Sequence, residues 1–370
     1  MVDLRAMRSN YRALSKVVGP ARVAGVVKAD AYGLGIAQVV PALAAEGCDT
    51  YFVATADEGI AVRHVAPDAR IFVLNGLFSA DAAALFAAQR LTPVLNGATD
   101  IALWERHCAS HGSDRSCALQ VDTGLNRLGL TVQQALAFAA DNALTRAVDP
   151  VLVMSHLACG DDRNHPLNRR QAQAFGAVRA AFPGVAASLA NSSGLLLGRD
   201  YHLDLVRPGI AIYGGAPSSG VTMKTVVTAE ARVLQVRRAQ VGEAVSYGAT
   251  RLLERDTLIA VAAVGYADGF PRAASGSGVP LRGVLPGGCG SIRGRRVPIL
   301  GRITMDLTMF DVTDLGADAV SAGDFIQLFG ADLPIDAAAK AAGTIAYELL
   351  TGLSRRYTRF HVGVEETTDA

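Results

Sequence analysis

Lysine is scarce in this chain of 370 residues. The chain contains 35 lysine and arginine residues in total, and the only lysines are Lys16, Lys28, Lys224 and Lys340. Arginine cannot form an imine with a carbonyl compound, because its guanidinium group stays protonated. A lysine retained at a structurally special position is therefore a candidate for amine chemistry.

Several other features are weak or missing, and each excludes a class of protein. The formal net charge is only +1, so there is no electrostatic case for binding nucleic acid or an anionic membrane. The five cysteines are scattered without a Cys-x-x-Cys pair, which argues against a zinc ribbon or a disulfide scaffold and fits a reducing compartment. No apolar run reaches the ~18 residues of a membrane helix, and no signal peptide is visible. These features predict a cytoplasmic location.

Common catalytic and binding motifs are also missing. The pair Gly33 and Gly35 lacks the third glycine and the acidic partner of a dinucleotide-binding fingerprint. The chain has no P-loop, no Gly-x-Ser-x-Gly elbow and no His-Glu-x-x-His. His107 and His111 share a helix face without an accompanying carboxylate motif, so we expect a solvated face and no metal site.

The first two-thirds of the chain alternates between strand-like and helix-like patterns. Eight strands are predicted, at residues 23–28, 51–55, 70–75, 91–96, 118–122, 151–156, 187–191 and 202–207. Helices are predicted between them, at residues 36–45, 57–64, 79–89, 99–111, 132–142, 166–182 and 193–197. Eight β/α units within about 200 residues favour a TIM (β/α)8 barrel. A doubly wound sheet is the alternative, because local pattern does not prove closure.

The pattern changes after Tyr213. Residues 215–220 have the composition of a linker, and beyond them come short strand-like runs at residues 226–236, 244–247, 257–264, 297–299, 307–312 and 325–329. One helix is predicted at 345–353, and the tail 365–370 has the composition of a disordered segment. We therefore predict an N-terminal barrel, residues 1–220, followed by a mostly β C-terminal domain, residues 221–370.

Polar residues follow the ends of the predicted barrel strands. They are Lys28, Asn75, Asn96, Asp122, His156, Asn191 and Arg207. In a TIM barrel this face carries the chemistry. Because loops also begin there, we interpret Asn75 and Asn96 as ordinary loop residues, whereas His156 and Arg207 are candidates for function. Lys28 alone could equally be an imine-forming amine or a surface lysine.

The loops after the last two predicted strands suggest a phosphate site, because TIM barrels often bind phosphate there. Ser192 and the backbone N–H groups of Ser193, Gly209 and Ile210 could hold a phosphate at short helix N-termini. Arg127, after the fifth strand, could bind a carboxylate or phenolate oxygen with two hydrogen bonds, although a loop arginine is usually only solvated.

Taken together, these motifs resemble the alanine racemase family, which are pyridoxal 5'-phosphate (PLP) enzymes with a barrel and a β-domain. The resemblance covers essentially the whole chain. It depends on the order and spacing of short motifs at residues 27–33, 122–129, 155–156, 191–193, 207–210, 246–248, 265–269, 305–306 and 347–348.

The resemblance implies roles for the matching residues. Lys28 would hold PLP covalently, and Tyr32, Ser192, Gly209, Ile210 and Tyr347 would bind its phosphate. His156 would contact the ring, Arg207 would face the pyridine nitrogen, and Arg127 would meet the phenolic oxygen and the substrate carboxylate. Tyr247, Tyr266, Met305 and Asp306 would come from the partner subunit, in an obligate homodimer with two shared active sites. Taken alone, Tyr247 and Tyr266 are glycine-flanked tyrosines for which packing is the ordinary interpretation.

The implied reaction is the interconversion of L- and D-alanine, which supplies D-alanine for peptidoglycan. Inversion at the α-carbon needs one proton-transferring group on each face, and the resemblance assigns these to Lys28 and Tyr247. A related barrel decarboxylase would place a glutamate at the position of Arg207, and a non-catalytic PLP carrier would lack the second domain. A broader racemase acting on alanine and serine stays open, because one hydroxyl in a pocket often discriminates only ~10–200-fold.

The chain departs from the family pattern at three places. Gln120 stands where a lysine, often carbamylated, braces the substrate-binding arginine. Thr304 stands where a cysteine often precedes Met-Asp, which leaves strict preference for alanine open. The segment Val2-Asp3-Leu4 lacks the strand that usually precedes the first motif, so we expect either a truncated start or one strand fewer in the β-domain.

Overall fold

The computed structural model describes residues 1–112, 114–218 and 220–363. It divides into two compact units, one formed by residues 8–212 and 216–223 and the other by residues 1–7, 213–215 and 224–370. The predicted domain boundary at residue 220 stays a prediction, and the tail predicted to be disordered lies outside the described residues.

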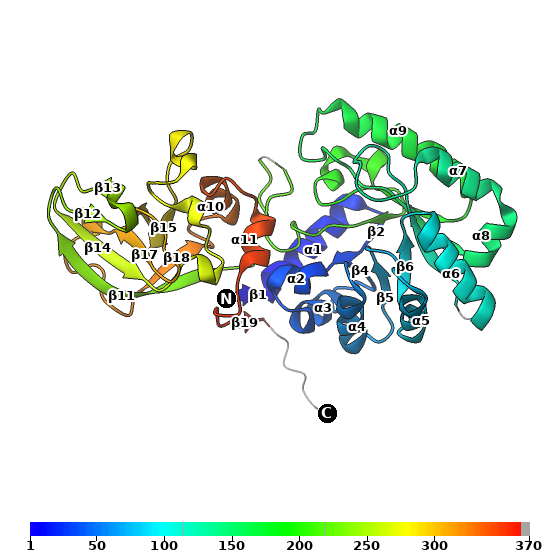
Figure 1. Ribbon diagram of the computed structural model, residues 1–370, viewed down its shortest axis with the longest axis horizontal. Coiled ribbons are helices and arrows are strands. Elements are labelled where there is room, and N and C mark those ends of the chain that lie inside the picture. Colours follow the sequence, from blue (N-terminus) through cyan, green and yellow to red (C-terminus); the bar gives the residue numbers. More distant parts are fainter. Residues whose placement is uncertain (113, 219, 364–370) are drawn as a thin grey trace. The chain divides into compact units, whose positions relative to one another are not determined.

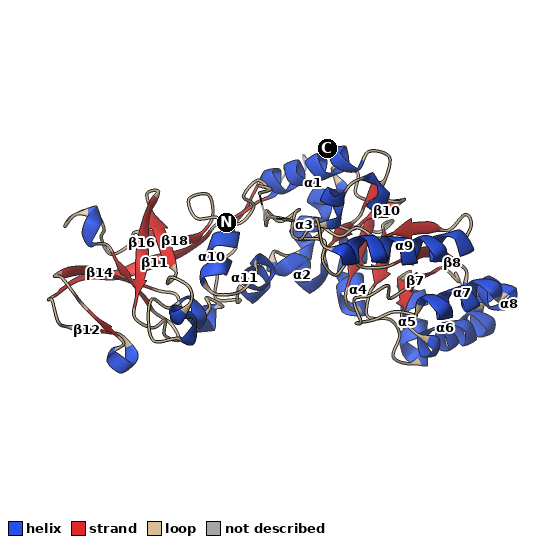
Figure 2. Cartoon of the chain, turned by 90° about the horizontal axis from the view of Figure 1, so that it is seen from above, coloured by secondary structure: helices blue, strands red, loops and turns tan. Residues whose placement is uncertain are grey.

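The larger unit is built on parallel strands (Figures 1 and 2). Seven of them form one sheet in chain order: β3 (Gly25–Val26), β4 (Thr50–Val53), β5 (Arg70–Val73), β6 (Thr92–Leu95), β7 (Cys117–Gln120), β8 (Pro150–Met154) and β9 (Ala186–Ser188). Nearly every residue of β4 to β9 is buried, as expected for parallel strands covered on both faces.

The ring of strands closes through the remaining segments. β10 (Leu205–Val206) pairs in parallel with β2 (Arg22–Val23), which precedes β3 by a single residue. On its other side β10 reaches β9, because Asp204 N–H donates to Ala187 O and Arg207 N–H to Ala190 O, at 3.1 and 2.9 Å. The predicted eight-stranded barrel is therefore confirmed, and the doubly wound sheet is excluded.

Helices surround these strands on the outside (Figure 1). They are α1 (Leu4–Val18), α2 (Lys28–Gly33), α3 (Ile36–Ala44), α4 (Ala56–Val65), α5 (Ala80–Ala88), α6 (Ala98–His111), α7 (Val132–Ala140), α8 (Asn142–Val148) and α9 (Pro166–Ala181), followed by the short 3-10 turns η1 (Gly194–Leu197) and η2 (Arg199–Tyr201). Local capping explains several starts. Thr55 and Glu58 form a capping box at α4, and Pro166 occupies the first turn of α9.

The smaller unit contains a closed antiparallel barrel with the order β11–β14–β17–β16–β15–β18. Its strands are β11 (Ala229–Ala239), β14 (Thr257–Ala262), β15 (Cys289–Ile292), β16 (Arg295–Leu300), β17 (Thr308–Asp311) and β18 (Phe325–Phe329). At the start of β11, Ala229, Ala231 and Val233 are buried while the residues between them are exposed. This period of two places one face of the strand in the barrel core.

Short elements complete the smaller unit. They are β1 (Val2–Asp3), β12 (Ala244–Val245), η3 (Tyr247–Ala249), β13 (Arg251–Leu252), η4 (Tyr266–Asp268), η5 (Arg272–Ala274), η6 (Pro280–Gly283), η7 (Thr313–Leu315), α10 (Ile335–Ala341), α11 (Ala346–Gly352) and β19 (His361–Val362). β1 pairs with β19, so the first residues of the chain join the β-domain. The β-rich character of this part is confirmed, although β1, β13, β15, β19 and α10 were not predicted. The expectation that the segment at Val2 lacks a strand was wrong, because Val2 and Asp3 form β1 by pairing with β19.

Candidate active site

Lys28 follows the end of β3, at the carboxyl edge of the barrel. The backbone then forms a left-handed turn: Ala29, Asp30, Ala31 and Tyr32 have φ values of 53°, 51°, 53° and 58°. L-residues avoid this conformation, at a cost of roughly 1–2 kcal/mol each. Such strain persists only where surrounding contacts impose it, and it gathers at functional sites.

The far end of this turn is held by its own residues. The Asp30 carboxylate accepts from Ile36 N–H at 2.8 Å, and Asp30 O accepts from Gly35 N–H at 2.9 Å. Gly35 has a φ of 100°, which only glycine adopts readily. The turn therefore carries Tyr32 back over the barrel end, while Lys28 stays at the strand terminus.

The Tyr32 hydroxyl lies directly on the backbone of Gly209. A Cβ atom at Gly209 would come within 2.1 Å of Tyr32 Oη, so no other residue fits this position without movement. Ser192 Oγ accepts hydrogen bonds from Gly209 N–H at 2.9 Å and from Ala211 N–H at 3.4 Å. The predicted free N–H of Gly209 is thus already used by Ser192. The hydroxyls of Tyr32 and Ser192 nevertheless both lie at Gly209, and each can donate a hydrogen bond to an oxyanion.

Arg207 is fully buried at the end of β10. Its guanidinium donates to Ser188 Oγ and, at 2.6 Å, to Ser155 O, and it lies 5.7 Å from the centre of the Phe52 ring. Burial lowers the pKa of Arg207 to about 9, so the group is still charged at neutral pH. Bonds from strands β8 and β9 therefore fix a cationic donor among the barrel strands.

His156 is held by a residue of the loop after β9 and by a residue of α9. Its Nε2 lies 3.3 Å from Asn191 Nδ2, and its backbone oxygen accepts from Gln171 Nε2 at 2.9 Å. Burial first, and then the charges of Arg207, Arg127 and Lys28, lower the pKa of His156 to about 3. The imidazole is therefore neutral at physiological pH.

Lys28 belongs to the same cationic group. Burial and the charge of Arg127 lower the pKa of its amine, against a smaller opposing effect of Glu58. Lowering the amine pKa favours the neutral, nucleophilic form that an imine needs. The cluster of Lys28, Arg127, His156 and Arg207 thus combines a candidate nucleophile with an environment that attracts anions.

This electrostatic arrangement predicts a pH dependence of stability. The folded-state pKa of His156, about 3, lies below its ordinary value of 6.5, so the unfolded chain binds an additional proton between these values. The stability linked to this group is complete above 6.5 and is lost as pH falls toward 3. Replacing His156 with Gln should reduce the pH slope of the unfolding free energy in this window by up to about 1.4 kcal/mol per pH unit.

Denaturant unfolding at several pH values between 3 and 6.5 measures that slope. His64→Gln, which changes an exposed histidine on α4, is the control and should keep the original slope. An unchanged slope in the His156 variant would contradict the assigned protonation state.

Asp122 shapes the loop that carries Arg127. Its carboxylate accepts from the N–H groups of Gly124, Leu125 and Arg127 at 2.8 to 2.9 Å. The Arg127 side chain is exposed beyond this turn. Gln120 is buried on β7 and donates to Val121 O at 3.4 Å, so its side chain is directed at the backbone.

The predicted residues of the β-domain lie on turns of the smaller unit. Tyr247 is 73 % exposed in a turn where Ser246, Gly248 and Ala249 all have positive φ values of 68°, 75° and 48°. Ser246 Oγ donates to Arg302 O at 2.7 Å, which joins this turn to the segment before Met305. The Tyr247 ring is therefore not packed into the core of this unit, and its role stays a prediction.

Tyr266 and Met305 are brought together by backbone bonds. Tyr266 N–H donates to Thr304 O at 3.1 Å, and Ala267 N–H donates to Met305 O at 3.0 Å. Tyr266 and Met305 are 45 and 53 % exposed. Asp306 forms an ion pair with Arg356 at 2.8 Å, and Tyr347 lies in the first turn of α11, 37 % exposed. Tyr266 and Met305 are therefore neighbouring, partly exposed side chains on this unit.

Thr304 uses its hydroxyl within its own turn. Oγ1 donates to Leu307 O at 2.9 Å and accepts from Leu307 N–H at 3.1 Å. The hydroxyl of Thr304, the residue that stands where the family often has a cysteine, is thus hydrogen-bonded within a local turn.

Three supporting residues were not singled out from the sequence. They are Gln171, Ser188 and Glu58, which are ordinary strand or helix residues by pattern, and only the folded chain brings them to the cluster. Ser155 was part of a motif that carried the resemblance, but no role was predicted for it. Asn191, by contrast, was noted at a strand end, and its contact with His156 supports a role in the site.

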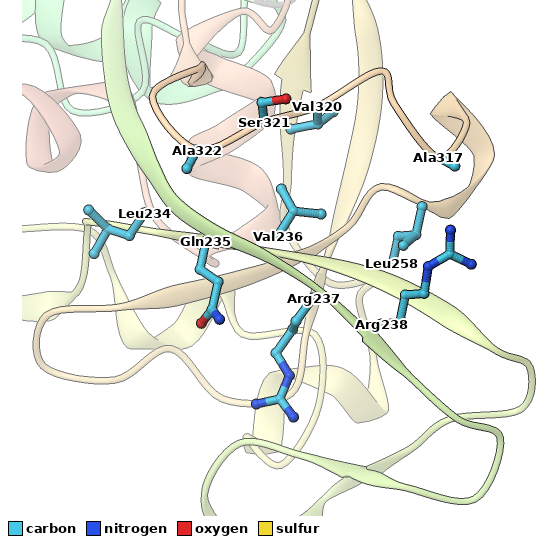
Figure 3. A pocket seen from close by; sticks show the side chains of 10 residues that line it. All are labelled: Leu234, Gln235, Val236, Arg237, Arg238, Leu258, Ala317, Val320, Ser321 and Ala322. Carbon is cyan, nitrogen blue, oxygen red and sulfur yellow. The ribbon is translucent and has the colours of Figure 1, made fainter.

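A separate pocket lies on the outside of the smaller unit (Figure 3). It is lined by Leu234 to Arg238 of β11, Leu258 of β14 and the segment around Ala317 and Val320–Ala322. None of the predicted site residues lines it. Within the described parts of the chain, no cluster of three metal-binding side chains occurs, and no helix is both long and apolar enough to cross a membrane.

A lysine at the carboxyl edge of a β/α barrel, a buried arginine whose charge acts on the same histidine, and a separate β-domain are the features of the barrel-plus-β-domain class of enzymes. Residues 2–217 match the family described as alanine racemase, N-terminal domain, and residues 226–361 match alanine racemase, C-terminal domain. The chain belongs to the alanine racemase family.

Individual relatives agree with this assignment. An alanine racemase of Rhizobium meliloti is 52% identical over 98% of this chain and 96% of its own length. A biosynthetic alanine racemase of Agrobacterium fabrum is 50% identical over 99% and 94%. Among solved structures, the alanine racemase of Bartonella henselae with covalently bound pyridoxal phosphate has a TM-score of 0.90 at 36% identity, covering 98% of both chains. The resemblance inferred from the sequence and the enzyme class it implied are therefore confirmed.

Proposed function

We propose that this PLP-dependent alanine racemase works with two bases, Lys28 and the partner subunit's Tyr247. We propose further that it acts in the cytoplasm, where it supplies D-alanine for peptidoglycan. One observation carries the proposal: the Lys28 amine, its pKa lowered by burial and by Arg127, lies at the carboxyl edge of the barrel. The five free cysteines support the cytoplasmic location, because disulfides are rare in reducing compartments.

The described residues fit PLP. The positive charges of Arg127 and Arg207 match an anionic cofactor, and the hydroxyls of Tyr32 and Ser192 both lie at Gly209, where side-chain bulk is excluded. Lys28 would attach the cofactor and His156 would contact its ring. Tyr32, Ser192, Gly209, Ile210 and Tyr347 would hold its phosphate, and Arg207 would face its ring nitrogen.

The residue chemistry supports inversion at the α-carbon. When bound, PLP supplies an electron sink that makes the α-proton of an attached amino acid removable. The Lys28 amine would take or return that proton on one face, and the Tyr247 hydroxyl would do so on the other. Arg207 would donate a hydrogen bond to the ring nitrogen, and because its guanidinium stays protonated at neutral pH it would leave that nitrogen without a proton, which would limit side reactions.

The substrate side of the site would come from both domains. Arg127 would bind the substrate carboxylate, and Met305, Tyr266 and Asp306 of the β-domain would line the partner's site. The side chains of Tyr247 and Met305 are 73 and 53 % exposed, as expected for residues that contact a partner subunit. We propose that the domain of residues 1–220 binds the cofactor and that residues 221–370 complete the site of the second copy in a homodimer.

A deuterium experiment tests this function. The purified protein is incubated with PLP and L-alanine in deuterated water, and both enantiomers and their α-deuterium are quantified. Deuterated D-alanine is expected. Exchange without inversion would contradict the role of Tyr247 or the dimer, and no exchange with PLP bound would contradict alanine as substrate. L-Serine, run in parallel, tests the broader alanine/serine alternative.

The cofactor cradle can be tested separately at Gly209. In Gly209→Ala the new Cβ would lie 2.1 Å from Tyr32 Oη, so the tyrosine must move away from the phosphate position. We expect the Kd for PLP to rise by about tenfold or more, which corresponds to ~1.4 kcal/mol. Titration of the cofactor-free protein measures it. Gly97→Ala, where a Cβ meets nothing within 4 Å, should leave the Kd unchanged.

A further inference from the structure

The left-handed turn after Lys28 is anchored unequally at its two ends. Asp30 and Gly35 hold the far end through bonds within the segment. At the near end, the backbone N–H of Ala29 donates to Glu58 Oε1 at 2.6 Å. Ala29 is the residue next to Lys28 and the first of the four left-handed residues. Lys28, at the end of β3, is therefore followed directly by a residue that is hydrogen-bonded to a side chain of α4.

Glu58 connects this near end to the neighbouring strand. Its other oxygen, Oε2, accepts from Ala54 N–H at 2.7 Å and from Thr55 N–H at 3.4 Å, just beyond the end of β4. A capping glutamate needs only the bond to Thr55. The additional short bonds to Ala29 and Ala54 make the carboxylate a bridge between two strand ends of the barrel.

The charge of Glu58 also acts on Lys28. The charged groups that influence the Lys28 amine are Arg127, from the loop after β7, and Glu58, from α4, while Arg207 and His156 belong to the same cluster. Arg127 lowers the pKa of Lys28 and Glu58 raises it. Glu58 thus holds the backbone next to Lys28 by a hydrogen bond and acts on the Lys28 amine through its charge.

We propose that Glu58 is a positioning residue of the cofactor site: its carboxylate clamps the left-handed turn to the end of β4 and so fixes the Lys28 amine for attachment of PLP. This inference rests on the proposed function. Glu58 acts only through Ala29 and Lys28 and touches no reacting atom.

Glu58→Gln tests the clamp, because an amide has only one accepting oxygen, so its N–H2 group must face either the Ala29 N–H or the N–H groups of Ala54 and Thr55. The matched control is Asp57→Asn, which removes the same charge from an exposed position one residue earlier. Hydrogen exchange of the cofactor-free protein should become faster in residues 28–35 in the Gln variant alone. Its Kd for PLP should rise about tenfold, since a hydrogen bond to a charged group contributes roughly that factor or more.

A third measurement separates positioning from capping. Loss of the negative charge lowers the amine pKa, so the pH dependence of PLP attachment should shift to lower pH in Glu58→Gln and stay in place in Asp57→Asn. Faster exchange confined to α4, with unchanged Kd and pH profile, would mean that Glu58 only caps the helix and would overturn the proposal. If the unaltered chain takes up no PLP, the proposed function fails, while the exchange result still decides whether Glu58 clamps the turn.

Discussion

Lys28→Arg should leave the barrel folded but abolish covalent attachment of PLP and lower racemisation by roughly 10⁴-fold. General-base catalysis alone contributes about 10²–10⁴-fold, and here the attachment point is lost as well. Arginine keeps most of the length of lysine but stays protonated, so the change removes the imine-forming amine without opening a cavity. The visible absorbance of the lysine-bound cofactor and the rate of D-alanine formation measure the two effects.

Lys16→Arg is the matched control, because Lys16 is an exposed residue near the end of α1. It should retain both the absorbance and the activity. Retention of either one in Lys28→Arg would contradict the role of Lys28, and the circular dichroism of both variants shows whether the fold is intact.

Tyr247→Phe should produce a defect that differs between the two enantiomers. The change removes one hydroxyl from an exposed ring and leaves the shape of the turn. If Tyr247 serves one face of the α-carbon, α-proton exchange from one enantiomer should fall by about 10²–10⁴-fold while exchange from the other stays detectable. Racemisation needs proton transfer on both faces of the α-carbon, so its rate should fall by as much as the slower of the two exchange rates.

Exchange from L- and D-alanine in deuterated water is measured separately, by mass detection after chiral separation. Tyr201→Phe, in the turn η2 of the barrel, is the control and should exchange both enantiomers normally. Equal loss of both exchanges in Tyr247→Phe would count against the two-base mechanism.

The barrel could be predicted from the sequence because its signals are local. Each strand is a short apolar run bounded by turn residues, and each of the eight predicted runs contains or overlaps an observed strand of the ring. β15 was missed because Cys-Gly-Ser-Ile has little intrinsic strand preference, and pairing with β16 imposes its conformation. The left-handed turn was missed for the same kind of reason. Ala29 and Ala31 give no sign of positive φ, and the hydrogen bonds that hold the turn, local ones at Asp30 and a tertiary one from Ala29 to Glu58, cannot be seen in the sequence.

The candidate site was predictable only as far as strand ends reveal it. Lys28, His156 and Arg207 stand where any barrel carries its chemistry, so position alone marked them. Gln171 and Glu58 lie within helix patterns, and their contacts with the loop of His156 and with Ala29 depend on how helices pack on the barrel. No local signal distinguishes such residues from the rest of a helix surface.

The closure of the barrel sets a constraint on the order of folding. Leu205 of β10 pairs with Arg22 of β2, so nearly the whole barrel sequence lies between two strands that must meet. The amino group of Met1 donates a hydrogen bond to the backbone oxygen of Thr228, 227 positions away. Contacts so distant in sequence form slowly, because the long loop between them must be ordered first. During synthesis β1 and β2 therefore stay without their partner strands until late in translation. At this stage the nascent chain depends most on protection from aggregation.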